Sequence, residues 1–228
     1  MLSAIAIVPA TPVLVPELVG AAATEVAGLR DAVLAAAGSL PARWLAVGVG
    51  PRDEVYGPDC AGTFAGYGVD VPVALGPGAV GEPAELPLCV LVAGWIRGQA
   101  TAGAGIEVHA YAASHPVGEA LARGRALRAR IDESPEQVGV LIVADGLHTL
   151  TPSAPGGYLP DSPATQQDLD DALATGDLAA LAELPEPVLG RVAYQVLAGL
   201  TGSAPGSARE MYRGAPYGVG YFVGEWLP

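Results

Sequence analysis

Basic residues, cysteines and histidines are scarce in this chain. There is no lysine, and 11 arginines stand against 24 acidic residues, so the formal net charge is −13. A surface of that charge repels phosphate backbones and anionic lipid headgroups, and we expect no nucleic-acid partner and no membrane partner. The two cysteines, Cys60 and Cys89, are too few for a disulfide framework or a cysteine-based metal cluster.

Long apolar runs are missing as well. The longest uncharged apolar run covers 86–96, which is too short to cross a bilayer. The amino-terminal segment is apolar, but prolines interrupt it at positions 9, 12 and 16, and its first basic residue is Arg30. A signal peptide needs basic residues ahead of an apolar stretch, so we expect neither a signal peptide nor a membrane span. The sequence therefore predicts a soluble, cytoplasmic protein.

Apolar and turn-forming residues are abundant. Of the 228 residues, 51% are hydrophobic and 15% charged, and 31 glycines and 21 prolines are spread along the chain. This composition predicts one globular domain, residues 1–228, with many short connections and no linker. The Ala, Gly and Val bias, with arginine as the only strongly basic residue, is typical of a GC-rich bacterial genome.

The periodicity of the apolar residues predicts an α/β fold. Continuous apolar runs predict buried strands at 4–8, 44–49 and 138–144. Further strands are expected at 68–75, at 106–111 and in a closing pair around 211 and 219–226. Helical spacing predicts helices at 18–37, 85–97, after Ser114 as a cap, from 162, and at 178–184 and 187–199. We interpret 52–68 as a loop. Alternating strands and helices predict a central, mostly parallel or mixed sheet with helices on both faces.

His148 lies where α/β proteins place functional groups. It follows the strand expected at 138–144, in the segment Asp145-Gly-Leu-His148, and loops at strand ends carry many binding and catalytic residues. It is either a pocket acid/base or a loop histidine bonded to its own turn. Asp145 either orients His148 or stabilises the turn, and the turn is the preferred interpretation. A metal site formed by His109, His115 and His148 is disfavoured, because their spacing matches no usual ligand pattern.

Three stretches together resemble the class III extradiol ring-cleavage dioxygenases, the catalytic-subunit-like (LigB-like) superfamily. They are Val-Pro-Ala-Thr-Pro-Val-Leu-Val-Pro-Glu at 8–17, Ala-Asp-Gly-Leu-His at 144–148 continuing to Ala-Pro-Gly-Gly-Tyr at 154–158, and Tyr-Arg-Gly-Ala-Pro-Tyr-Gly-Val-Gly-Tyr at 212–221. The resemblance, to a divergent actinobacterial-type member, extends over nearly the whole chain. It implies a LigB-like fold, non-haem Fe(II) held by two histidines and a carboxylate, and a further histidine that exchanges protons with a bound catechol.

The residues that the resemblance assigns to iron are not donors in this chain. The first histidine ligand falls on Ala10, the second falls at Gly50-Pro51, and the carboxylate falls on Gly214, with Glu210 the nearest acidic residue. The acid/base position falls on His148. Because alanine and glycine have no side-chain donor atom, we predict that the chain binds no iron in the family manner and needs no cofactor.

The leading hypothesis is therefore a divergent pseudoenzyme that binds a small molecule in a pocket near His148. The pocket residues would be Ala10, Gly50, Gly214, Tyr158 and Tyr217, with His148 and Asp145 as candidate catalytic residues. Tyr221 is interpreted as packing. The resemblance also favours a homodimer. An alternative is an active metal-dependent oxidoreductase with unusual ligands, such as the acidic residues of 53–59 with a histidine from elsewhere, and a third is a purely structural protein.

Overall fold

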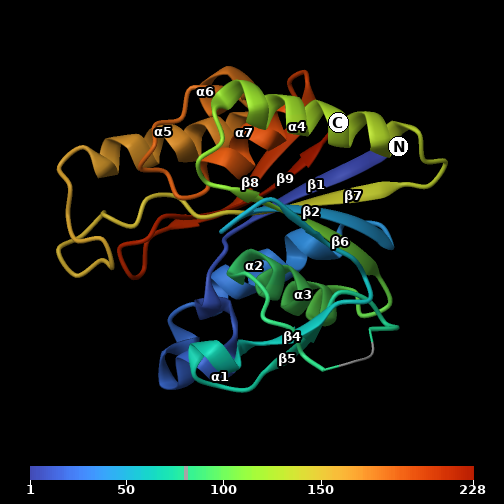
Figure 1. Ribbon diagram of the computed structural model, residues 1–228. Coiled ribbons are helices and arrows are strands. Elements are labelled where there is room, and N and C mark those ends of the chain that lie inside the picture. Colours follow the sequence, from blue (N-terminus) through green and yellow to red (C-terminus); the bar gives the residue numbers. More distant parts are fainter. Residues whose placement is uncertain (80–81) are drawn as a thin grey trace.

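The computed structural model describes residues 1–79 and 82–228, and a seven-stranded mixed sheet crosses its centre (Figure 1). The strand order is β3-β6-β2-β7-β1-β9-β8. The four inner strands β6, β2, β7 and β1 are mutually parallel, whereas β3, β9 and β8 pair antiparallel with their neighbours. The strands are β1 (Leu2–Val8), β2 (Arg43–Gly50), β3 (Glu54–Tyr56), β6 (Gly105–Ala112), β7 (Val138–Val143), β8 (Ser207–Gly214) and β9 (Tyr221–Leu227).

Helices cover both faces of this sheet. One face carries α2 (Ala27–Gly38) and α3 (Leu88–Ala100), with a small sheet of β4 (Ala61–Thr63) and β5 (Pro72–Ala74) beyond them. The other face carries α4 (Val117–Asp132), α5 (Ser162–Thr175), α6 (Leu178–Ala182) and α7 (Arg191–Thr201). The predicted α/β fold with a mixed, two-sided sheet is confirmed. Among the described residues, no helix combines the length and the apolar character that crossing a bilayer requires.

Each inner strand contributes side chains to two hydrophobic cores, one on each face of the sheet, because successive side chains of a strand point to opposite faces. In β1, Ala4, Ala6 and Val8 pack in the core with α2 and α3, whereas Ile5 and Ile7 pack in the core with α4 and α7. This two-sided burial explains why the sequences of β1, β2 and β7 are largely continuous apolar runs rather than alternating ones.

Several predicted boundaries are wrong. The helix expected at 18–37 is divided into α1 (Pro16–Val19), a 3-10 turn at Gly20–Thr24, and α2. Gly20 ends α1 with a φ of 54°, a conformation that favours glycine. Ser114 does not cap α4: the helix begins after Pro116, which has extended backbone and no side-chain cap bond.

The segment expected to be a loop at 52–68 is partly regular. It contains β3, β4 and a 3-10 turn at Phe64–Tyr67, and the strand expected at 68–75 shortens to β5. The helix expected at 85–97 is α3, which begins after Pro87. The remaining predicted strands and helices are present with boundaries shifted by a few residues.

Candidate functional site

The segments singled out by the sequence meet at one edge of the sheet. Because β1, β2 and β7 are parallel, their carboxyl ends lie at the same edge. Ala10 follows β1, Gly50 ends β2, and Asp145 follows β7. The chain continues from β7 into the loop with His148, and the β8–β9 turn lies at the same edge.

The contact between the ends of β1 and β7 lies at a topological switch point. From β1 the chain passes to α2 on one face of the sheet, and from β7 it passes to α5, α6 and α7 on the opposite face. Connections that diverge in this way leave a space outside the strand ends, which is where open α/β sheets bind ligands. We call this place the β1/β7 switch point.

Asp145 bridges the β1/β7 switch point. Its Oδ1 accepts a hydrogen bond from the Ala10 N–H at 2.8 Å, and its backbone oxygen accepts one from the Gly190 N–H at 2.9 Å. Burial raises the pKa of the Asp145 carboxyl from 3.8 to about 7, although the bond from Ala10 acts against this rise. The residue nevertheless remains partly exposed. A carboxyl with a pKa near 7 can exchange a proton near neutral pH.

Two tyrosines lie near this carboxyl, and a threonine hydroxyl contacts one of them. The Thr11 and Tyr221 hydroxyls lie 3.1 Å apart in the interior, and burial raises the pKa of Tyr221 to about 12, with the nearby Asp145 charge adding to the rise. The buried Tyr194 hydroxyl donates to the Ala144 oxygen at 2.8 Å. Both tyrosines therefore keep their protons at neutral pH and can act only as neutral hydrogen-bonding groups.

His148 is not oriented by Asp145. Among the described residues, its Nδ1 is buried and has no hydrogen-bond partner. The Asp145 carboxylate is instead bound to Ala10, so it neither orients His148 nor closes its own turn. Only the His148 backbone is held locally, through a bond from the Gly156 N–H to its oxygen at 2.9 Å. A histidine that transfers protons is usually held by a partner on its second nitrogen, and no described residue supplies one here.

The other predicted pocket residues have no hydrogen bond to Asp145 or His148 among the described residues. Tyr158 is 49% exposed, and the Tyr217 hydroxyl donates to Glu25 at 3.3 Å. Gly214 ends β8 and lies opposite Tyr221. Two cavities lie elsewhere, one of about 510 Å³ between α5 and α6 and one of about 690 Å³ at the amino ends of β2 and β6. Neither cavity is lined by a predicted site residue.

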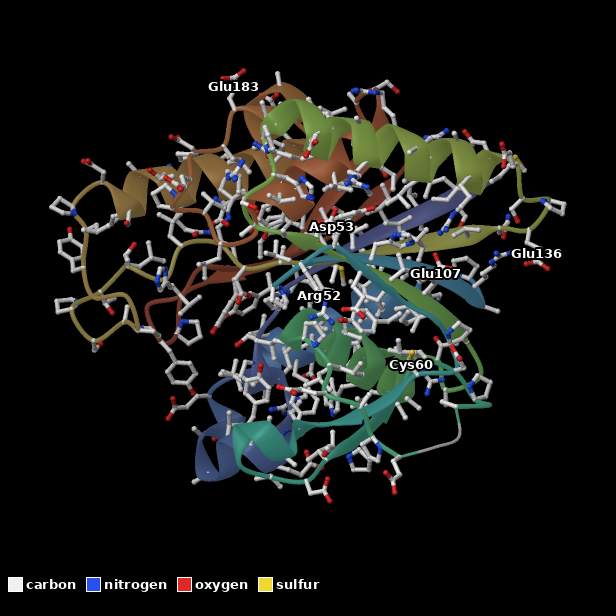
Figure 2. All side chains as sticks on the ribbon, in the orientation of Figure 1. Arg52, Asp53, Cys60, Glu107, Glu136 and Glu183 are labelled. Carbon is white, nitrogen blue, oxygen red and sulfur yellow. The ribbon has the colours of Figure 1, made fainter. Side chains whose placement is uncertain are left out.

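The three histidines do not form a common site. His115 has Asp53 Oδ1 on Nε2 at 2.6 Å and Glu119 Oε2 on Nδ1 at 2.7 Å. His109 has Glu107 on Nε2 at 2.6 Å. Figure 2 shows Asp53 and Glu107 at separate places along the sheet. His109 and His115 each belong to an ion-pair group of their own, and the structure places His148 in neither group.

The residues at the β1/β7 switch point do not fit an iron centre. Fe(II) of this type needs three protein donors on one side, and Ala10, Gly50 and Gly214 offer none from their side chains. Among the described residues, no group of three or more His, Cys, Asp or Glu side chains is placed to hold a metal ion.

Gln166 is the residue of this region that sequence reasoning missed. It lies on α5, is 7% exposed, and its side chain binds the backbone of the His148 loop. The spacing of residues along α5 could have indicated that Gln166 is buried. Gln166, Leu169, Asp170 and Leu173 follow helical spacing and are all buried, so two polar side chains occupy the inward face of α5. Buried polar groups of this kind are hydrogen-bonded.

Comparisons with known proteins bear on the fold. No family model and no curated protein matches the chain. A solved structure, described as the uncharacterized protein JW3007 from Escherichia coli K12, is similar with a TM-score of 0.58 and 11% sequence identity, over 98% of this chain and 99% of that one. At that identity the likeness supports the α/β fold along the whole chain and carries no information about activity.

Proposed function

We propose that this chain is a class III extradiol dioxygenase-like protein that binds a small molecule at the β1/β7 switch point without the family's iron. The observation that carries the proposal is Asp145, a partly exposed residue that bridges the switch point through its bond to Ala10 and whose carboxyl pKa is raised by burial to about 7. Groups with strongly shifted pKa values at such places are frequently functional. The absence of donor side chains at Ala10, Gly50 and Gly214 supports binding without iron.

The chemistry of the site favours a neutral ligand with hydroxyl groups. At neutral pH the Asp145 carboxyl is divided between its two protonation states, so it both donates to and accepts from a hydroxyl. A phenol or catechol fits this behaviour, whereas a carboxylate ligand would be repelled by the ionised fraction and by a chain of net charge −13.

The first test is direct binding. Catechol and a set of substituted phenols would be titrated into 15N-labelled, iron-free protein. We expect saturable shifts of the backbone amides of residues 10–11 and 145–148, weakened roughly tenfold in Asp145→Asn, the loss expected for one hydrogen bond to a charged group. Asp168→Asn, an exposed carboxyl on α5, is the matched control and should leave binding unchanged. Shifts confined to other surfaces would contradict the proposal.

The second test addresses iron. The protein would be incubated anaerobically with Fe(II), dialysed and analysed for metal, with oxygen uptake recorded in the presence of catechol. We expect no stoichiometric iron. Retention of one iron per chain together with oxygen uptake would instead support the alternative, an active oxidoreductase with unusual ligands. The observation that favours this alternative is the grouping of Asp53, His115 and Glu119. However, the His115 ring lies between the two carboxylates and bonds to both of them. Arg123 also pairs with Asp53 at 2.9 Å.

A further inference from the structure

The side chain of Gln166 connects α5 to the two loops at the switch point. Its Oε1 accepts a hydrogen bond from the Leu147 N–H at 2.8 Å. The same short stretch of backbone is paired with the β8–β9 turn, because the Gly146 N–H donates to the Gly220 oxygen at 2.9 Å and the Gly220 N–H donates to the Leu147 oxygen at 2.8 Å. The glutamine therefore lies where the two loops join.

Glycines make room for this amide. A Cβ added at Gly146 would lie 2.6 Å from the Gln166 Nε2, and a Cβ added at Gly220 would lie 2.5 Å from the same atom. Neither glycine has a positive φ, so its backbone conformation does not demand glycine. Glycine is required at both positions because the Gln166 side chain leaves no room for a Cβ.

A second buried side chain fixes which way the amide faces. Gln166 Nε2 donates to Asp170 Oδ1 at 2.8 Å. Because the Asp170 carboxyl accepts from the amide nitrogen of Gln166, the amide oxygen must face Leu147, whose N–H can only donate. Asp170 is 6% exposed and burial raises its pKa to about 6. The network leads from a buried carboxyl through an amide to the backbone two residues beyond Asp145.

We propose that Gln166 is the positioning residue of the β1/β7 switch point, fixing the 145–147 backbone so that the Asp145 carboxyl stays bound to Ala10 and largely shielded from water. This inference takes the switch point as the site of the proposed function. Its tests need no ligand, so its failure and the failure of ligand binding are separate results.

The experiment replaces Gln166 with methionine, which keeps the length of the side chain and removes both hydrogen bonds. In Gln166→Met we expect the Leu147 amide to exchange with solvent roughly fivefold to tenfold faster, the change that corresponds to one ordinary hydrogen bond. We also expect the Asp145 carboxyl, followed by 13C NMR, to titrate closer to the ordinary aspartate range. A residue that only supported the fold would lower stability without moving the Asp145 pKa in the folded protein.

Two variants keep this test decisive. Gln195→Met removes another buried amide, which donates to the Ala182 oxygen at 3.1 Å and accepts from Arg191 at 3.2 Å, and it should leave the Asp145 titration unchanged. Gln166→Glu keeps an acceptor for Leu147 and should retain slow exchange below about pH 6, where the Asp170 carboxyl is protonated. If Asp145 and Leu147 behave in Gln166→Met as they do in the unmodified protein, the proposal is overturned.

Discussion

His109 and His115 lie six residues apart, but their surroundings shift their pKa values in opposite directions. The hydrogen bond to Asp53 is the largest cause that raises the pKa of His115, and the bond to Glu119 adds to it. Burial lowers the pKa of His109, against the opposing effect of Glu107. Since both ring nitrogens of His115 face carboxylates, both bonds form only when the ring carries two protons.

We therefore expect the two rings to titrate on opposite sides of 6.5. The stability contributed by the His115 pairs is present below the unfolded pKa and is lost as the pH rises through the folded one, so His115→Gln should cost roughly 1 kcal/mol at pH 5.5 and less at pH 9. NMR of the ring protons and urea unfolding at the two pH values measure this. A His115 midpoint below that of His109 would refute the assignment.

At the same scale, Asp145 shows how much of the site could be predicted. The apolar run at 138–144 was sufficient to place Asp145 and His148 at a strand end. The bond from Ala10 to Asp145 joins residues 135 positions apart, and no local pattern reports such a pairing. For the same reason, the orphaned Nδ1 of His148 could not be foreseen, because it depends on which loops pack around the ring.

Among the elements, α4 and α7 cross with their backbones in unusually close contact. A Cβ at Gly124 of α4 would lie 2.6 Å from the Leu200 nitrogen, and a Cβ at Gly199 of α7 would lie 2.9 Å from the Leu121 Cα. Backbone atoms cannot move aside as a flexible side chain can. We expect Gly124→Ala to force the helices apart and to lower the free energy of unfolding by about 1–3 kcal/mol.

The control for this prediction is on the same helix. Gly118, in the first turn of α4, has no atom within 4 Å of an added Cβ, so Gly118→Ala should be neutral or stabilising by up to about 1 kcal/mol, through helix propensity. Urea midpoints of the two variants would be compared, and equal shifts would show that the crossing is not the cause. The sequence does not predict this close contact, because the spacing of apolar residues does not report how closely two helices approach.

For the whole molecule, the fold class was predictable and the strand order was not. Apolar runs of strand length, separated by helical patterns, predict an α/β fold because each element must bury its own apolar face. The short strands β3 and β4 were missed because Glu54–Tyr56 and Ala61–Thr63 contain too few residues to show a period. The order β3-β6-β2-β7-β1-β9-β8 depends on pairings between distant segments.

The pH dependence of stability is a property of the whole molecule to which Asp145 contributes measurably. Its folded pKa, about 7, lies above the unfolded value of 3.8. Between these values the folded state holds a proton that the unfolded chain has released, so this carboxyl lowers stability as the pH rises from about 4 to about 7. Asp170 acts in the same direction, with a folded pKa of about 6.

Asp145→Asn removes this penalty while keeping an oxygen that can accept from Ala10. We expect the variant to match the unmodified protein near pH 4 and to be more stable at pH 8, by on the order of 2 kcal/mol once the partial solvent contact of the side chain is allowed for. Urea unfolding at both pH values gives the difference, and Asp168→Asn, exposed on α5, should show none. A variant that is less stable at pH 8 would mean that the ionised carboxylate is stabilised at the switch point, and the shielding inferred for Asp145 would be wrong.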